Sequence, residues 1–104
     1  MKKREILLDI RRVILSIEPS AEIILYGSVA RGTATEESDW DFLILLDGEV
    51  DHKRTDRIRH ALYEIEWDNG LVLSAIVRSR SVWNDPIHSA SPFHQNVLRD
   101  GVAI

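Results

Sequence analysis

The chain has 104 residues and a formal net charge of −4, from 13 Lys and Arg against 17 Asp and Glu. It contains no cysteine, which excludes a disulfide frame, a thiol nucleophile and a cysteine-based zinc site. A hydrophobic share of 44% in a chain of this length predicts one globular domain over residues 1–104 with one modest core. The mild acidity argues against a general nucleic-acid binder.

The N-terminal segment predicts an amphipathic helix. Apolar residues recur at helical spacing from Ile6 to Ile17, charged residues fill the positions between them, and Pro19 ends the pattern. These charges interrupt what would be the apolar region of a signal peptide, and no apolar run approaches the roughly 20 residues of a membrane span. The sequence therefore favours a cytoplasmic protein that does not enter a membrane.

Two strands with a short helix between them are expected next. Residues 23–26 form an apolar run that predicts a short buried strand, and residues 28–31 predict a helical turn that Gly32 closes. Residues 39–46 predict the second strand. Its last five residues are apolar on both faces, which indicates a central strand covered on both sides.

The second half of the chain continues the alternation of helices and strands. A charged helix is predicted over residues 51–67, a strand over 71–77 and irregular chain over 79–89. Ser91 is then the expected N-cap of a last helix, and residues 102–104 are a candidate edge strand. This order predicts a small α/β sandwich in which helices pack on a sheet.

The residues that carry chemistry lie in one stretch between the first two strands. Gly27 lets the backbone approach a ligand, and helix N-terminal amides with the Ser28 hydroxyl can hold phosphate oxygens. Arg31 can add charge to a phosphate site or fix the loop. Asp39 and Asp41 are two residues apart at a strand start, so both carboxylates project from one face. Each piece alone is common in ordinary turns, but together they predict metal-assisted nucleotidyl transfer.

This arrangement resembles a known signature. Gly27-Ser28, ten intervening residues and then Asp39-Trp40-Asp41 resemble the pattern of the minimal nucleotidyltransferases, members of the polymerase-β-like superfamily. Ala30-Arg31-Gly32 and Ser38 are also similar to that family. The resemblance implies a nucleotidyltransferase palm, an α+β fold with a small mixed sheet and helices packed on it. It also implies one or two Mg²⁺ ions and a nucleoside triphosphate such as ATP.

The same resemblance assigns roles to individual residues. It implies that the catalytic and metal-binding residues are Asp39 and Asp41. The nucleotide-binding residues would be Gly27, Ser28, Arg31 and Ser38.

One departure from the family pattern concerns a third carboxylate, which the superfamily usually carries on a later strand. The corresponding strand has none, and Ser74 occupies the position where an aspartate is expected. A serine cannot replace it as a base at neutral pH without an activating neighbour. Glu64, Glu66 and Asp68 precede this strand and are interpreted as a solvated helix end.

The remaining aromatic residues and histidines are interpreted as structural. Trp40, between the two aspartates, is expected to point to the opposite face into the core. Trp67 and Trp83 are predicted packing residues, with stacking on a base as the alternative for Trp83. The histidines show no metal-ligand spacing; they are His52, His60, His88 and His94.

Three functions remain open from the sequence. The first is a nucleotidyltransferase that moves a nucleoside monophosphate to an acceptor hydroxyl and releases pyrophosphate. The second is a catalytically weak or inactive module that binds nucleotide and a partner, as the antitoxin-like half of a pair with a helical HEPN protein. The third is a regulatory domain without the chemistry. A chain of this length has no room for a separate acceptor domain, so we expect a protein partner.

Overall fold

The computed structural model describes residues 3–35 and 38–104. Its elements, in chain order, are α1 (Lys3–Ile17), β1 (Glu22–Tyr26), α2 (Gly27–Arg31), β2 (Trp40–Leu46), α3 (His52–Asn69), β3 (Leu73–Ser79), α4 (Arg80–Trp83), a 3₁₀ turn (Pro86–His88), α5 (Pro92–Asp100) and β4 (Val102–Ala103). Within these described ranges, none of the helices combines the length and apolar character that a membrane crossing needs.

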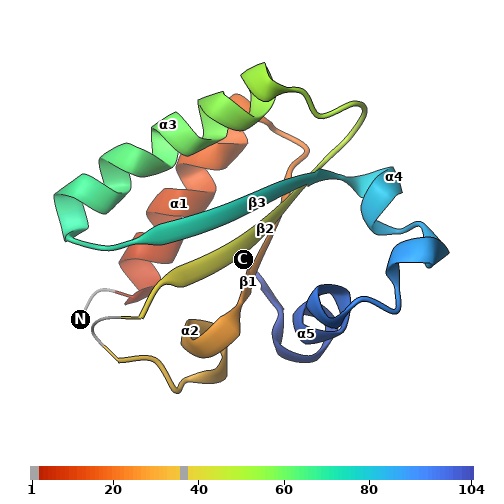
Figure 1. Cartoon of the computed structure of the whole chain (residues 1–104). Coiled ribbons are helices and arrows are strands. Elements are labelled where there is room, and N and C mark those ends of the chain that lie inside the picture. The colour runs from red at the N-terminus through yellow and green to blue at the C-terminus, as the bar shows by residue number, and fades with distance from the viewer. Residues whose placement is uncertain (1–2, 36–37) are drawn as a thin grey trace.

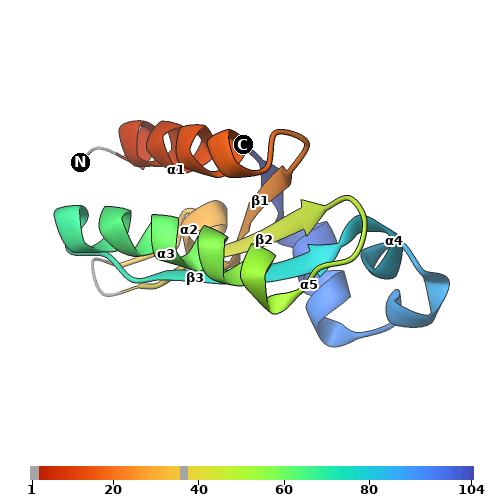
Figure 2. The same cartoon turned by 90° about the horizontal axis from the view of Figure 1, so that it is seen from above.

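The four strands form one mixed sheet in the order β3-β2-β1-β4. β1 pairs antiparallel with both β2 and β4, whereas β2 and β3 run parallel. The predicted small mixed sheet with packed helices is therefore confirmed, as is the terminal edge strand. Figure 1 shows α1 and α3 on one side of this sheet and α5 on the other. Seen from above in Figure 2, α1 and α3 lie side by side, and they contact each other.

The larger hydrophobic cluster lies under α1 and α3. Each helix contributes a stripe at a spacing of three or four residues, which turns one face toward the sheet. The buried members of these stripes are Ile6, Ile10 and Ile14 from α1, and Ile58, Leu62 and Ile65 from α3. Alternate residues of β2 meet them from the sheet: Trp40, Phe42, Ile44 and Leu46.

A smaller cluster covers part of the other face of the sheet. Leu43 and Leu45 of β2 pack there against Trp83 of α4 and Val97 of α5. The Trp83 ring stacks on His94 at a centroid distance of 4.0 Å, which confirms Trp83 as a packing residue. Because residues 42–46 are all buried and serve both clusters, the prediction of a central strand covered on both sides is also confirmed.

Two local expectations are wrong. Residues 79–89 were expected to be irregular but contain α4 and the 3₁₀ turn, because the Ser79 and Asp85 side chains accept hydrogen bonds from backbone N–H groups and cap these turns. Trp67 is 79% exposed rather than packed. It follows Ile65 by two positions, and two helical steps rotate a side chain by about 200°, away from the buried stripe.

An ion pair joins the end of α1 to the start of α3. Arg54 donates from Nε and Nη2 to the two carboxylate oxygens of Glu18, at 2.9 and 2.7 Å. Its Nη1 donates to the backbone oxygens of Asp47 and Glu49, in the connection between β2 and α3. One guanidinium group thus joins the end of α1, the start of α3 and the connection between β2 and α3, and its pairing with Glu18 is bidentate.

Candidate active site

The candidate site begins where β1 ends. Gly27 follows Tyr26 with a φ of +78°, in the left-handed region that glycine adopts without strain. A Cβ atom at Gly27 would lie only 2.5 Å from Oδ2 of Asp41. Glycine is therefore needed here both for the backbone turn and for the close approach of the loop to the carboxylate. The structure thus brings together the two pieces that the sequence singled out.

Asp41 occupies the middle of a row of three residues across the sheet. In the observed register it pairs with Tyr26 of β1 on one side and with Ser74 of β3 on the other. Directly paired residues project from the same face, so these three side chains share the face opposite α1 and α3. The neighbouring Trp40 is buried in the larger cluster, as predicted from its position between the two aspartates.

The negative charge of Asp39 acts on the Asp41 carboxyl. Burial raises the pKa of the Asp41 carboxyl above its usual range, the negative charge of Asp39 raises this pKa further, and the Arg31 guanidinium lowers it. The negative charge of ionised Asp41 is therefore only partly compensated by protein groups. Two carboxylates with unbalanced charge suit a divalent cation such as Mg²⁺, which takes oxygen ligands from protein and substrate together. Among residues 3–35 and 38–104, no group of three or more acidic, histidine or cysteine side chains gathers as a metal site.

Loop contacts hold the predicted nucleotide-binding residues. The backbone oxygen of Ser28 accepts a hydrogen bond from the Thr33 N–H at 3.0 Å, which closes the turn after α2. The Ser38 hydroxyl accepts one from the Thr35 N–H at 2.9 Å. This contact joins Ser38 to Thr35, and the role of Ser38 in nucleotide binding remains a prediction.

Arg31 contacts the C-terminal helix α5. Its Nη1 donates to Oδ2 of Asp100 at 3.0 Å, an ion pair between α2 and α5. The sequence left two roles open for Arg31, binding phosphate or fixing the loop. The contact with Asp100 supports the second role. The charge of Arg31 also acts on Asp41, so it remains electrostatically part of the site.

The third carboxylate is missing from the strand where it was expected, and its place beside Asp41 is taken by Ser74. The interpretation of the acidic cluster before β3 as a solvated helix end is wrong for Glu66. Its Oε2 accepts a hydrogen bond from the Leu73 N–H at 2.9 Å and so fixes the start of β3. The exposed Glu64 and Asp68 agree with that interpretation.

Tyr26 is a site residue that the sequence analysis missed. Burial and the nearby Asp41 carboxylate both raise the pKa of its hydroxyl, and its ring packs edge-on against Phe93 at 5.5 Å. Tyr26 lies beside Asp41 because of the register between β1 and β2, and the residues around Tyr26 in the sequence do not indicate that register. Only its position directly before Gly27 pointed to the neighbourhood of the site.

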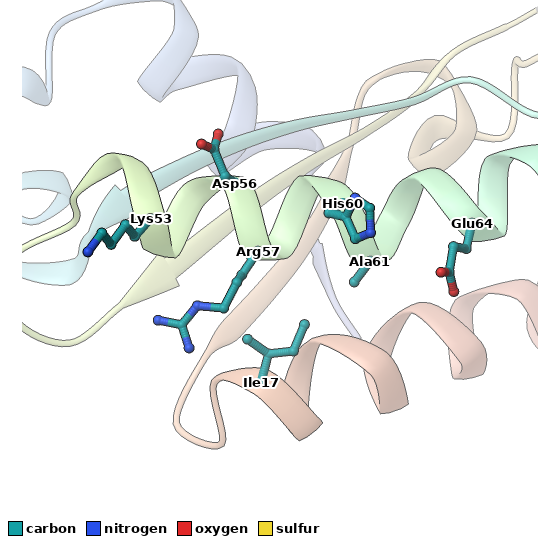
Figure 3. Close-up of a pocket in the computed structure, with 7 residues that line it drawn as sticks. All are labelled: Ile17, Lys53, Asp56, Arg57, His60, Ala61 and Glu64. Carbon is teal, nitrogen blue, oxygen red and sulfur yellow. The ribbon is translucent and has the colours of Figure 1, made fainter.

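A pocket of about 790 Å³ lies away from these residues, between α1 and α3. Figure 3 shows Ile17 of α1 pointing toward α3, and Ala61 and Glu64 of α3 pointing toward α1. Charged residues of both signs line it, including Lys53, Asp56 and Arg57, and none of the predicted site residues does.

Three comparisons with known proteins relate this chain to nucleotidyltransferases in sequence or in fold. A family model described as a nucleotidyltransferase domain matches residues 7–99. A protein of Methanocaldococcus jannaschii named "Putative protein adenylyltransferase" is 42% identical over 80 residues, which is 77% of this chain and 73% of that protein. The crystal structure of a toxin-antitoxin with AMP-PNP superposes with a TM-score of 0.64 over 92% of this chain and 69% of that one. At 19% identity, the last likeness shows the shared fold.

Proposed function

This chain belongs to the nucleotidyltransferase domain family, and on that premise we propose that it transfers a nucleoside monophosphate from a nucleoside triphosphate to an acceptor hydroxyl. The acceptor oxygen bonds to the α-phosphorus while the bond to the bridging oxygen breaks, and pyrophosphate leaves. One observation carries this proposal: the backbone at Gly27 lies so close to Asp41 that a Cβ atom there would be 2.5 Å from the carboxylate oxygen Oδ2. The proposed polyphosphate-binding loop and the Asp41 carboxylate thereby lie next to each other.

Asp39 and Asp41 are the residues that would hold one or two Mg²⁺ ions. Bound Mg²⁺ offsets the charge of the triphosphate and stabilises the oxygens around the reacting phosphorus. Gly27 keeps the space in front of Asp41 free of a side chain, while Ser28 and Arg31 are the proposed contacts of the triphosphate. Reaction therefore depends mainly on positioning and charge, which is typical of phosphoryl transfer.

We further propose ATP as the nucleotide and a protein as the acceptor. The name of the Methanocaldococcus jannaschii relative, a protein adenylyltransferase, supports both choices. The related fold with AMP-PNP belongs to a toxin-antitoxin, which supports a partner protein of that kind. The proposed partner is a short, all-helical HEPN-type protein encoded beside this chain.

Calorimetric titration of AMP-PNP, with and without Mg²⁺, tests the nucleotide site. We expect binding by the unmodified protein only when Mg²⁺ is present, and loss of that binding in the Asp39→Asn/Asp41→Asn double variant. Asp9→Asn is the matched control, because Asp9 lies in an exposed ion pair on α1. Absence of Mg²⁺-dependent binding, or its survival in the double variant, would contradict the proposal.

A second candidate function is favoured by Ser74. Its position beside Asp41 puts a hydroxyl where the family pattern has a carboxylate, which fits a module that binds nucleotide and partner with little or no transfer. Incubation with α-labelled ATP, Mg²⁺ and the helical partner separates the two functions. Label on the partner supports transfer, whereas a stable unlabelled complex supports binding alone.

Ser74→Asp sharpens that comparison. It restores a carboxylate on the face of Asp41, so an active enzyme should label its partner faster. A pure binding module should gain affinity for Mg²⁺ without labelling.

A further inference from the structure

We propose that Asp100 is a positioning residue for the nucleotide site, because it holds the guanidinium of Arg31 in place for the incoming triphosphate. This inference rests on the proposed function, since it concerns how the same site takes its nucleotide. Asp100 itself would touch neither the nucleotide nor a metal; it would act through Arg31.

The contact between the two residues is asymmetric. Arg31 Nη1 lies 3.0 Å from Asp100 Oδ2, and the two residues are 69 positions apart in the chain. The side chain of Arg31 is 44% exposed, whereas that of Asp100 is only 9% exposed. The carboxylate is therefore the fixed partner of the pair, and the guanidinium is the partner that a ligand can reach.

Several contacts fix Asp100. The neighbouring Arg99 donates from Nε to Oδ1 at 3.1 Å and from Nη2 to Oδ2 at 3.2 Å. These bonds and Arg31 hold the pKa of the Asp100 carboxyl below its usual range. The following Gly101 packs so tightly that a Cβ there would collide with the Val97 carbonyl oxygen and lie 2.8 Å from Ile24 Cγ2.

The last strand attaches this carboxylate to the strand that carries the loop. β4 pairs with β1 through Val102 and Leu25, and the Ile104 N–H donates to the Ile23 oxygen at 3.0 Å. β1 runs directly into Gly27. The segment that carries Asp100 is therefore attached, through β4, to the strand that leads into the proposed phosphate-binding loop at Gly27.

The held guanidinium retains binding capacity. Nη1 makes the bond to Asp100, while Nε and Nη2 make none within the described part of the chain, so their donors remain for phosphate oxygens. Arg31 lies close enough to Asp41 to act on that carboxyl. A free arginine loses much rotamer freedom when it binds a ligand, and a side chain that is already ordered loses less. Asp100 thus pre-organises Arg31 for the triphosphate.

A double-mutant cycle tests this pre-organisation. The dissociation constant of AMP-PNP with Mg²⁺ would be measured for the unmodified protein, Arg31→Ala, Asp100→Ala and the double variant. Loss of a charged hydrogen bond should make Arg31→Ala bind about tenfold more weakly in the unmodified background. In the Asp100→Ala background, the same change should cost less than about threefold, because Arg31 is no longer held there.

The other outcomes overturn the proposal. An equal cost of Arg31→Ala in both backgrounds would make Asp100 a purely structural residue. A larger cost in the Asp100→Ala background would show that Asp100 competes with the nucleotide for Arg31. If the unmodified protein shows no Mg²⁺-dependent binding, the proposed function fails and this inference fails with it. Binding with an additive cycle contradicts the inference alone.

Two further variants serve as a milder substitution at Asp100 and as a control at an unrelated carboxylate. Asp100→Asn retains a side-chain oxygen of similar shape, so it serves if Asp100→Ala melts at a much lower temperature; the cost of Arg31→Ala should then be intermediate. Asp9→Ala removes a carboxylate from the exposed pair with Arg12 on α1. In that background Arg31→Ala should keep its full cost of about tenfold, and a reduced cost would contradict a specific role for Asp100.

Discussion

The two faces of the sheet differ in how completely helices cover them. α1 and α3 close one face with apolar stripes, so that Phe42 and Ile44 are wholly buried. On the other face, α4 and α5 cover only part of the sheet, and the row of Tyr26, Asp41 and Ser74 remains partly accessible. The closed face supplies the apolar burial that stabilises the fold, which allows the open face to carry the poorly compensated carboxylate of Asp41.

The same contrast is visible in two arginine–carboxylate pairs. On the closed side, Glu18 and Arg54 are both largely shielded and engage through two hydrogen bonds. On the open side, Arg31 uses one donor for Asp100 and stays accessible. Substitutions on the closed face should therefore change stability, whereas substitutions on the open face should change binding more than stability.

The largest effect on stability is expected for Phe42→Ala. Phe42 is 0% exposed in the centre of the main cluster, so its truncation should lower the free energy of unfolding by about 3–5 kcal/mol. Urea denaturation followed by circular dichroism measures this. Leu8→Ala, at an exposed position of α1, should cost less than about 0.5 kcal/mol. Similar costs for the two variants would contradict the assignment of the closed face as the stabilising core.

Glu18→Gln is expected to cost about 1.5–3 kcal/mol at neutral pH, because it removes the charge from the bidentate pair with Arg54. Hydrogen bonding to Arg54 holds the pKa of Glu18 below its ordinary value of 4.5 in the folded protein. The stabilisation is therefore present above pH 4.5 and is lost as pH falls through the lower folded value. The difference in stability between the two proteins should therefore decrease as pH is lowered below 4.5; a constant difference would contradict this.

Gly27→Ala should cost about 1–2 kcal/mol of stability because alanine is strained at a positive φ. It should also abolish Mg²⁺-dependent binding of AMP-PNP, since the new Cβ meets Asp41. Gly32→Ala is a matched control, with a φ of +77° and nothing within 4 Å of its Cβ. It should lose similar stability but keep binding. Equal binding losses would show that backbone strain, rather than contact with Asp41, decides the effect.

The smallest change in stability is expected for Asp41→Asn, and it should be a gain. The pKa of Asp41 is raised in the fold, so its ionised form destabilises the folded state at neutral pH. The gain should be less than about 1 kcal/mol, since solvent screens this partly exposed group. It should shrink as pH falls through the raised folded value and vanish below 3.8, where the wild-type carboxyl is protonated in both states. A lower melting temperature without Mg²⁺ at pH 7 would contradict this.

Much of the fold could be predicted because single elements decide it locally. Apolar spacing set the stripes of α1 and α3, and Ser91 caps α5 through its bond to the His94 N–H, as expected. Trp67 shows the limit of this approach. Its aromatic character favoured burial, but its angular position on α3 turns it to solvent.

By itself, the sequence determined that Gly27 opens a loop after a strand, and it predicted that the carboxylates of Asp39 and Asp41 project together. Both follow from local backbone geometry, with a period of two along a strand. Only the tertiary structure decided that Ser74 lies beside Asp41, that Glu66 fixes the start of β3 and that Asp100 holds Arg31. Each of these contacts depends on strand register or on packing between distant segments, for which no local pattern encodes a partner.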